Sequence, residues 1–151
     1  MIHRRHALAL MGAALALPAA APVWADQPMI HARSGLAIGG YDPVAYFTQG
    51  KPVKGKSAHK VMWKGAVWTF ASAAHREAFE ADPRRFAPQF GGYCAYAVSR
   101  GYTAKTDPKA WKVHEGRLYL NYSTQVRTLW SRDIPGNIAL ARGNWPGVLS
   151  K

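Results

Sequence analysis

Cysteine and acidic side chains are scarce in this sequence of 151 residues. Its single cysteine excludes an internal disulfide, a CxxC redox pair and a cysteine-rich zinc site. Only 8 Asp and Glu stand against 20 Lys and Arg, a formal net charge of +12, so few carboxylates are available for acid–base catalysis. Hydrophobic residues make up 48% of the chain, which is typical of a globular domain rather than a disordered one. The length suits one domain.

The first 25 residues have the layout of a secretory signal peptide. A short basic stretch (residues 1–5) precedes an apolar run (residues 7–21), and Val23 and Ala25 precede a cleavage site after Ala25. The apolar run is shorter than the roughly 20 residues that a transmembrane helix needs, and an uncleaved anchor is the alternative. The Arg-Arg pair in the basic stretch resembles a twin-arginine signal, and the sequence leaves open whether that route or Sec is used.

We therefore expect a mature protein that is periplasmic or secreted after cleavage near Ala25. No second long apolar run follows, so no transmembrane segment is expected in the mature chain. Export argues against nucleic acid as the partner, despite the basic charge. The interspersed lysines of residues 51–64 could form one positive face, which would suit an anionic surface of the cell envelope or simply interact with solvent.

The mature sequence divides into a flexible leader (residues 26–35) and one domain (residues 36–151). Local patterns predict an α+β fold: a small antiparallel sheet of two hairpins packed with short helices, and a C-terminal helical pair. The predicted elements are a short helix capped by Asp42, a hairpin over 60–70, a helix from Ser72 to Ala81, an apolar strand or turn over 93–98, a hairpin over 111–120, and helices from Ser123 and Pro135.

Three stretches of the sequence stand out together: the runs at residues 40–47, 68–72 and 79–95. Together they resemble the YHS domain family, in its exported bacterial branch, and the tail from Trp111 to Trp145 is also similar to that branch. The resemblance covers about residues 36–146 and implies a small α+β module. Related modules accompany copper-transporting ATPases and metal-dependent oxygenases, so the resemblance implies a metal-related role. Those relatives carry paired cysteines after an aromatic strand, and the corresponding stretch here, residues 68–75, has none.

The remaining candidates for a metal site are Cys94, His59, His75 and Met62. A thiolate, imidazoles and a thioether are the soft ligands that Cu(I) favours, so the four could form a copper site if the fold brings them together. Each also has a structural interpretation. Cys94 would be a small buried hydrophobe, Met62 a core residue, and His75 an exposed residue in the first turn of its helix.

These observations leave three hypotheses for the function. The first is a non-catalytic exported module that binds or senses a metal such as copper. The second is a metal-free structural or interaction protein of the cell envelope, and the third is an enzyme that uses Cys94 as its nucleophile. The many aromatic residues fit a core or a pocket for an apolar ligand, and the sequence assigns no cofactor other than the copper candidate.

Overall fold

The computed structural model describes residues 26–151, so the predicted signal peptide (residues 1–25) lies outside the described residues. The strands are β1 (Ala32–Arg33), β2 (Leu36–Ala37), β3 (Lys56–Trp63), β4 (Ala66–Phe70), β5 (Asp107–His114) and β6 (Arg117–Asn121). The α-helices are α1 (Ala45–Thr48), α2 (Ala73–Ala81), α3 (Pro83–Phe86), α4 (Ala95–Ser99), α5 (Thr124–Trp130) and α6 (Ile134–Asn144). Short 3-10 turns are η1 (Ile38–Gly40), η2 (Gln89–Gly92), η3 (Ser131–Asp133) and η4 (Gly147–Ser150). This mixture confirms the predicted α+β class.

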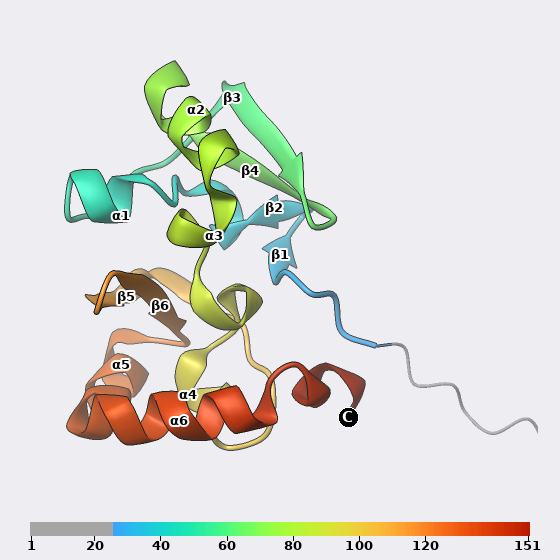
Figure 1. Ribbon diagram of the computed structural model, residues 1–151, viewed down its shortest axis with the longest axis vertical. Helices are drawn as coiled ribbons and strands as arrows, with labels where there is room; N and C mark the ends of the chain where they lie inside the picture. Colours follow the sequence, from blue (N-terminus) through green and yellow to red (C-terminus); the bar gives the residue numbers. More distant parts are fainter. Residues whose placement is uncertain (1–25) are drawn as a thin grey trace, which may run out of the picture.

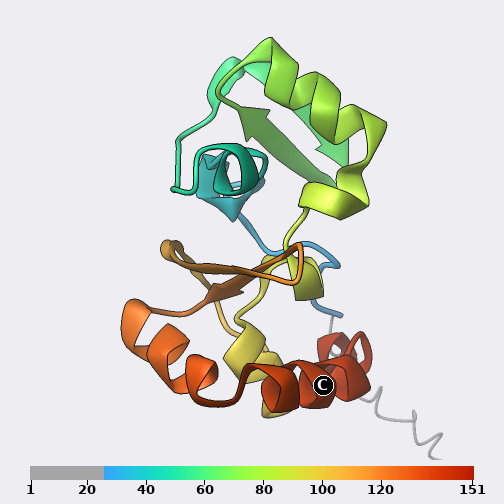
Figure 2. The same ribbon diagram turned by 60° about the vertical axis from the view of Figure 1, so that its left-hand side comes forward.

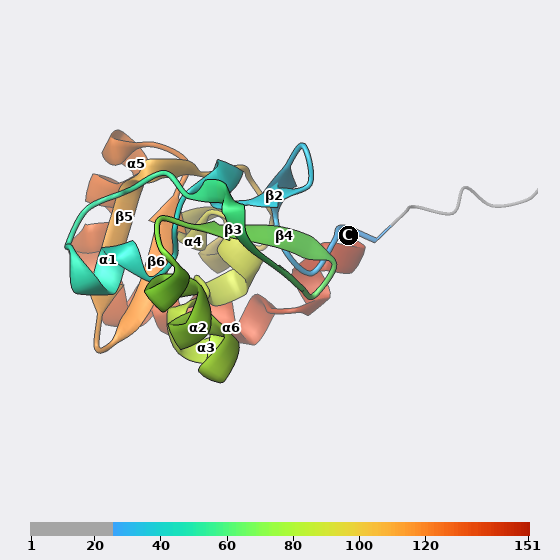
Figure 3. The ribbon, with the colours of Figure 1, turned by 90° about the horizontal axis from the view of Figure 1, so that it is seen from above.

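The molecule has an upper and a lower part in the views of Figures 1 and 2. The upper part holds β1 to β4 with α1 to α3, and the lower part holds β5 and β6 with α4 to α6. Seen from above, α2 and α3 lie on one side of the β3–β4 hairpin (Figure 3). The two predicted hairpins therefore do not share one antiparallel sheet. The first belongs to a four-stranded sheet of order β1-β2-β4-β3, in which β2 runs parallel to β4, and the second forms a two-stranded sheet.

Strand β3 is the edge of the four-stranded sheet, and its side chains alternate between two surroundings. Val61 and Trp63 pack against the upper core, whereas Lys60 and Met62 are exposed on the other face. This is the alternation that a half-buried strand requires. The turn to β4 is made by Lys64 and Gly65, both with positive φ, as a two-residue hairpin turn demands.

Strand β6 joins two hydrophobic cores, because successive side chains of a strand point to opposite faces. Leu118 and Leu120 are fully buried in the upper cluster, together with Trp68 and Phe70 of β4. Tyr119 points into the lower cluster. The two-stranded sheet thus serves as the layer between the upper and lower parts of the molecule.

The lower core is built by the helical pair that the sequence predicts. Ser123 caps α5 by accepting from the Val126 N–H, and Trp130 at the end of that helix is fully buried. Helix α6 buries Ile138 and Ala141, as the spacing of its apolar residues indicates. The C-terminal helical pair is therefore confirmed.

Two segments differ from the prediction. The apolar stretch at residues 93–98, expected as a strand or turn, forms the helix α4, whose first bond joins the Val98 N–H to the Cys94 carbonyl. In a short continuous apolar run, no alternation of apolar and polar residues distinguishes a strand from a helix. The segment 26–35, expected as a flexible leader, contributes β1, a buried Ile30 and a backbone hydrogen bond from His31 to Gly91. Among residues 26–151, no helix has the length and apolarity to cross a membrane.

Candidate functional site

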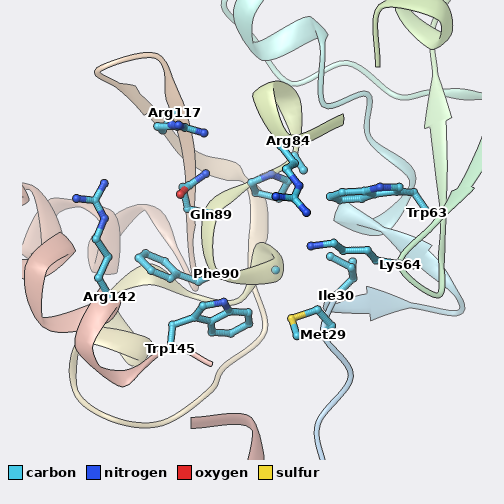
Figure 4. Close-up of a pocket in the computed structure, with 13 residues that line it drawn as sticks. Met29, Ile30, Trp63, Lys64, Arg84, Gln89, Phe90, Arg117, Arg142 and Trp145 are labelled. Carbon is cyan, nitrogen blue, oxygen red and sulfur yellow. The ribbon is translucent and has the colours of Figure 1, made fainter. Parts of the chain in front are cut away.

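A cavity of about 370 Å³ lies where the upper and lower parts meet, and four cationic side chains line it (Figure 4). We call it the basic pocket and define it by Lys64, Arg84, Arg117 and Arg142. Lys64 comes from the β3–β4 turn and Arg84 from α3, both in the upper part. Arg117 begins β6 and Arg142 lies on α6, in the lower part. The pocket therefore exists only when both parts are in place.

No acidic side chain lines the basic pocket within the described part of the chain. The salt bridges found among residues 26–151 involve Arg76, His75 and His114, and none reaches a cation of the pocket. Lys64 lies over the ring of Trp63, with its Nζ atom 4.8 Å from the ring centroid. Asp82 lines an adjoining hollow together with Arg84 and Arg117, but no described carboxylate forms a salt bridge with a cation of the basic pocket.

Apart from Gln89, the side chains that form the other walls of the basic pocket are apolar. Phe90 and Ile30 are buried, and the rings of Phe90 and Trp145 meet edge to face, with centroids 6.1 Å apart. Met29 is 44% exposed and Trp63 is half-buried against the upper core. Cations and aromatic surface thus share one cavity, which is the composition of a pocket with a few polar groups on an apolar frame.

A second polar cluster is centred on Asp42, whose carboxylate is fully buried. One carboxylate oxygen, Oδ1, accepts from the backbone N–H groups of Val44 (2.8 Å) and Ala45 (3.2 Å). The other, Oδ2, accepts from the Ala71 N–H (2.8 Å) and pairs with Nδ1 of His75 (2.6 Å). Four partners compensate the burial of this charge, and they tie the start of α1 to the end of β4 and to α2.

His75 is held on both sides of its ring. Nδ1 faces Asp42, and Nε2 lies 3.2 Å from the hydroxyl of Thr48 on α1. Its side chain is only 16% exposed, so the expectation of an exposed first-turn residue was wrong. The predicted cap of this helix is confirmed, because Ser72 accepts from the His75 N–H.

Cys94 lies at the start of α4, with an exposed fraction of 1%. Its Sγ atom is 3.6 Å from Oδ1 of Asn121 and accepts from the Tyr122 N–H at 3.3 Å. Burial raises the pKa of the Cys94 thiol above its ordinary value, although nearby backbone N–H groups act against this. A buried, neutral thiol is the state of a structural cysteine, and nucleophilic cysteines have the opposite properties.

The two other proposed ligands lie on β3. His59 is half-buried on the inward face of that strand, and Met62 is 67% exposed on the outward face. The structural interpretation of Met62 as a core residue was therefore wrong.

Cys94, His59, His75 and Met62 thus occupy separate surroundings. The partners of Cys94 are Asn121 and Tyr122, and those of His75 are Asp42 and Thr48. Over residues 26–151, no group of three or more His, Cys, Asp or Glu side chains is placed to hold a metal ion. The donor set therefore does not form the ligand shell that a bound copper would need.

The sequence did not reveal the basic pocket. Its four cations come from four different elements, and Lys64 and Arg142 are 78 positions apart in the numbering of the chain. The only available signal was the shortage of acids, because a chain with 8 acids cannot neutralise 20 basic side chains.

Residues 44–90 match the family model of the YHS domain, so the chain contains a YHS domain, as the resemblance predicted. The matched region begins one residue before α1 and ends in η2, which places it in the upper part and its junction with the lower part (Figure 1). Arg117, Arg142 and the C-terminal helices lie beyond it. No curated protein matches the chain, and no solved structure does.

Proposed function

We propose that this protein is a non-catalytic binding module, exported after loss of residues 1–25, that binds a small anion in the basic pocket. One observation carries the proposal: four cationic side chains line a cavity whose described lining includes no carboxylate. Like charges placed together repel, and this repulsion weakens when an anion enters. The four residues are exposed, so solvent screens part of this repulsion, and a bound anion would lower the rest.

The size and walls of the cavity agree with a small ligand. A volume of about 370 Å³ falls in the range of roughly 300–1,000 Å³ that is usual for small-molecule sites. Guanidinium groups pair with two oxygens of a phosphate or carboxylate at once, so Arg84, Arg117 and Arg142 suit oxyanions better than halides.

Titration with inorganic phosphate, followed by calorimetry at low salt, tests the proposal. The variants Arg117→Gln and Arg142→Gln should each weaken binding by about ten-fold or more, since a charge-assisted hydrogen bond contributes about 1.5–3 kcal/mol. The matched control is Arg132→Gln, which changes an exposed arginine of η3 that does not line the pocket. Equal loss of affinity in all three variants, or no binding to the parent protein, would refute the proposal.

A metal-related role is a second proposal, supported by the orientation of His75. The Asp42 carboxylate holds Nδ1 of His75, so the other ring nitrogen, Nε2, points toward Thr48 and the surface. Carboxylates orient metal-binding histidines in this way. In this proposal copper is cargo that the protein carries or senses, and Nε2 of His75 exchanges its contact with Thr48 for the metal, whose other ligands come from the cargo's source or from solvent.

Metal analysis of protein purified from its native export route tests this second proposal. His75→Gln should lower the bound copper, and Cys94→Ser should leave it unchanged, because the Cys94 thiol is buried away from His75. Equal copper in the parent and in His75→Gln would remove His75 from the site. Lower copper in Cys94→Ser alone would favour the thiolate ligand proposed from the sequence.

A further inference from the structure

Many of the apolar side chains of the basic pocket gather at one end. Figure 4 shows Phe90, Trp145 and Met29 toward this apolar end, and Arg117, Gln89 and Arg84 toward the other. Arg142 and Lys64 lie between the two ends, beside Phe90 and Ile30, and Trp63 lies beside Arg84. A simple inorganic anion would need only the cations. The apolar end offers a surface that gains free energy only by contact with an apolar group.

The chain adopts an uncommon backbone conformation to build the apolar end. Phe90 and Gly91 are consecutive residues in the left-handed region, with φ of 56° and 61°. A β-carbon on Gly91 would collide with the carbonyl of Met29, so only glycine lets the N-terminal segment approach this closely. The Gly91 carbonyl then accepts from the His31 N–H at 2.8 Å. Together these features hold Met29 at the pocket beside Phe90 and Trp145, and such strained residues are common at ligand sites.

From cations and apolar side chains that line the same pocket we infer that the ligand is an organic anion with a flat apolar body, such as an aryl phosphate, sulfonate or carboxylate. The acidic group pairs with the arginines, and the apolar body lies against Phe90, Trp145 and Met29. This inference rests on the proposed anion-binding function and adds the class of ligand. The small cavity favours a free molecule over a membrane lipid, whose two acyl chains would exceed about 370 Å³.

Three probes separate the two ends of the pocket: 1-naphthyl phosphate has both groups, inorganic phosphate only the anion, and 1-naphthol only the ring. The inference predicts a dissociation constant for naphthyl phosphate at least about ten-fold below that of inorganic phosphate, with naphthol the weakest. Met29→Ser should lower the affinity for naphthyl phosphate by about three-fold or more and leave the affinity for inorganic phosphate unchanged. Met62→Ser is the matched control, because Met62 is an exposed methionine of β3 outside the pocket.

The outcomes distinguish the inference from the function on which it rests. If both phosphates bind equally, the anion site stands and the organic ligand is refuted. If neither phosphate binds, or naphthol binds as tightly as naphthyl phosphate, the anion-binding function itself fails. Sedimentation with phosphatidylglycerol vesicles, without binding of naphthyl phosphate, would replace the free ligand by a membrane surface. If Met29→Ser and Met62→Ser lose affinity equally, the apolar end has no part in binding.

Discussion

The buried carboxylate of Asp42 allows a quantitative test of the upper core. Asp42→Asn keeps the shape of the side chain and the oxygen that accepts from Val44 and Ala45. It replaces the other oxygen, Oδ2, by an amide NH₂ group. That group then faces the N–H of Ala71, 2.8 Å from the present oxygen, and the ring nitrogen of His75 at 2.6 Å. The new amide NH₂ group and the Ala71 N–H are both donors, so they cannot form a hydrogen bond. Nδ1 of His75 can still accept from the amide if the ring proton moves to Nε2.

The expected loss follows from these contacts. An unsatisfied backbone donor costs about 1–3 kcal/mol, and the lost charge on the bond to His75 adds about 1 kcal/mol or more. We therefore expect Asp42→Asn to lower the free energy of unfolding by about 3 kcal/mol, a large part of the roughly 5–15 kcal/mol typical of a domain. Urea titration followed by tryptophan fluorescence at pH 7 measures this change.

Asp82 provides a matched control in the same chain. It also precedes a proline and caps a helix, accepting from the Arg85 N–H at 3.3 Å, but it is exposed. Asparagine caps helices as well as aspartate does, so Asp82→Asn should change stability by less than about 0.5 kcal/mol. If the two variants lose the same stability, or if Asp42→Asn costs under about 1 kcal/mol, the Asp42 network does not stabilise the fold as we describe.

Two further predictions concern the Cys94 thiol and the glycines. Burial raises the pKa of the Cys94 thiol above its ordinary value of 9.0, so the thiol ionises at a lower pH in the unfolded chain, and the free energy of unfolding should fall as pH rises through 9. Urea titrations at pH 8–10.5 should show a smaller fall for Cys94→Ala than for the parent protein. An equal fall in both proteins would contradict the raised pKa. Gly55→Ala should lower the melting temperature strongly, because the added β-carbon would collide with Thr69. Gly143→Ala in α6 is the contrasting variant: its β-carbon meets open space, so it should raise the free energy of unfolding by about 0.5–1 kcal/mol. Thermal unfolding followed by circular dichroism measures both, and an unchanged melting temperature for Gly55→Ala would refute the collision.

Local signals in the sequence predicted most of the elements, because they act over a few residues. Ser72 and Ser123 cap the helices that they were expected to cap, and Lys64 and Gly65 form the turn of the first hairpin. The sheet arrangement was not predicted, because the parallel pairing of β2 with β4 joins residues about 30 positions apart. No turn or cap in the sequence specifies such a contact.

The candidate sites were harder to predict than the elements, because each depends on contacts between distant residues. The sequence pattern puts His75 in an exposed first turn, and only the fold brings Asp42, 33 positions earlier, against its ring. The soft-ligand site was inferred from residue chemistry without spacing to support it. The basic pocket is assembled from elements spread from Met29 to Trp145, so composition showed the excess charge but not its location.

The lysines on the outward face of β3 affect how copies of this protein meet in solution. An edge strand offers unpaired backbone groups to any chain that approaches, including a second copy of this protein. Lys56 and Lys60 are exposed along that edge, so pairing two copies there would bring like charges together where their repulsion is costly. The sheet is therefore protected against growth into a fibre by the same basic excess that makes the composition unusual.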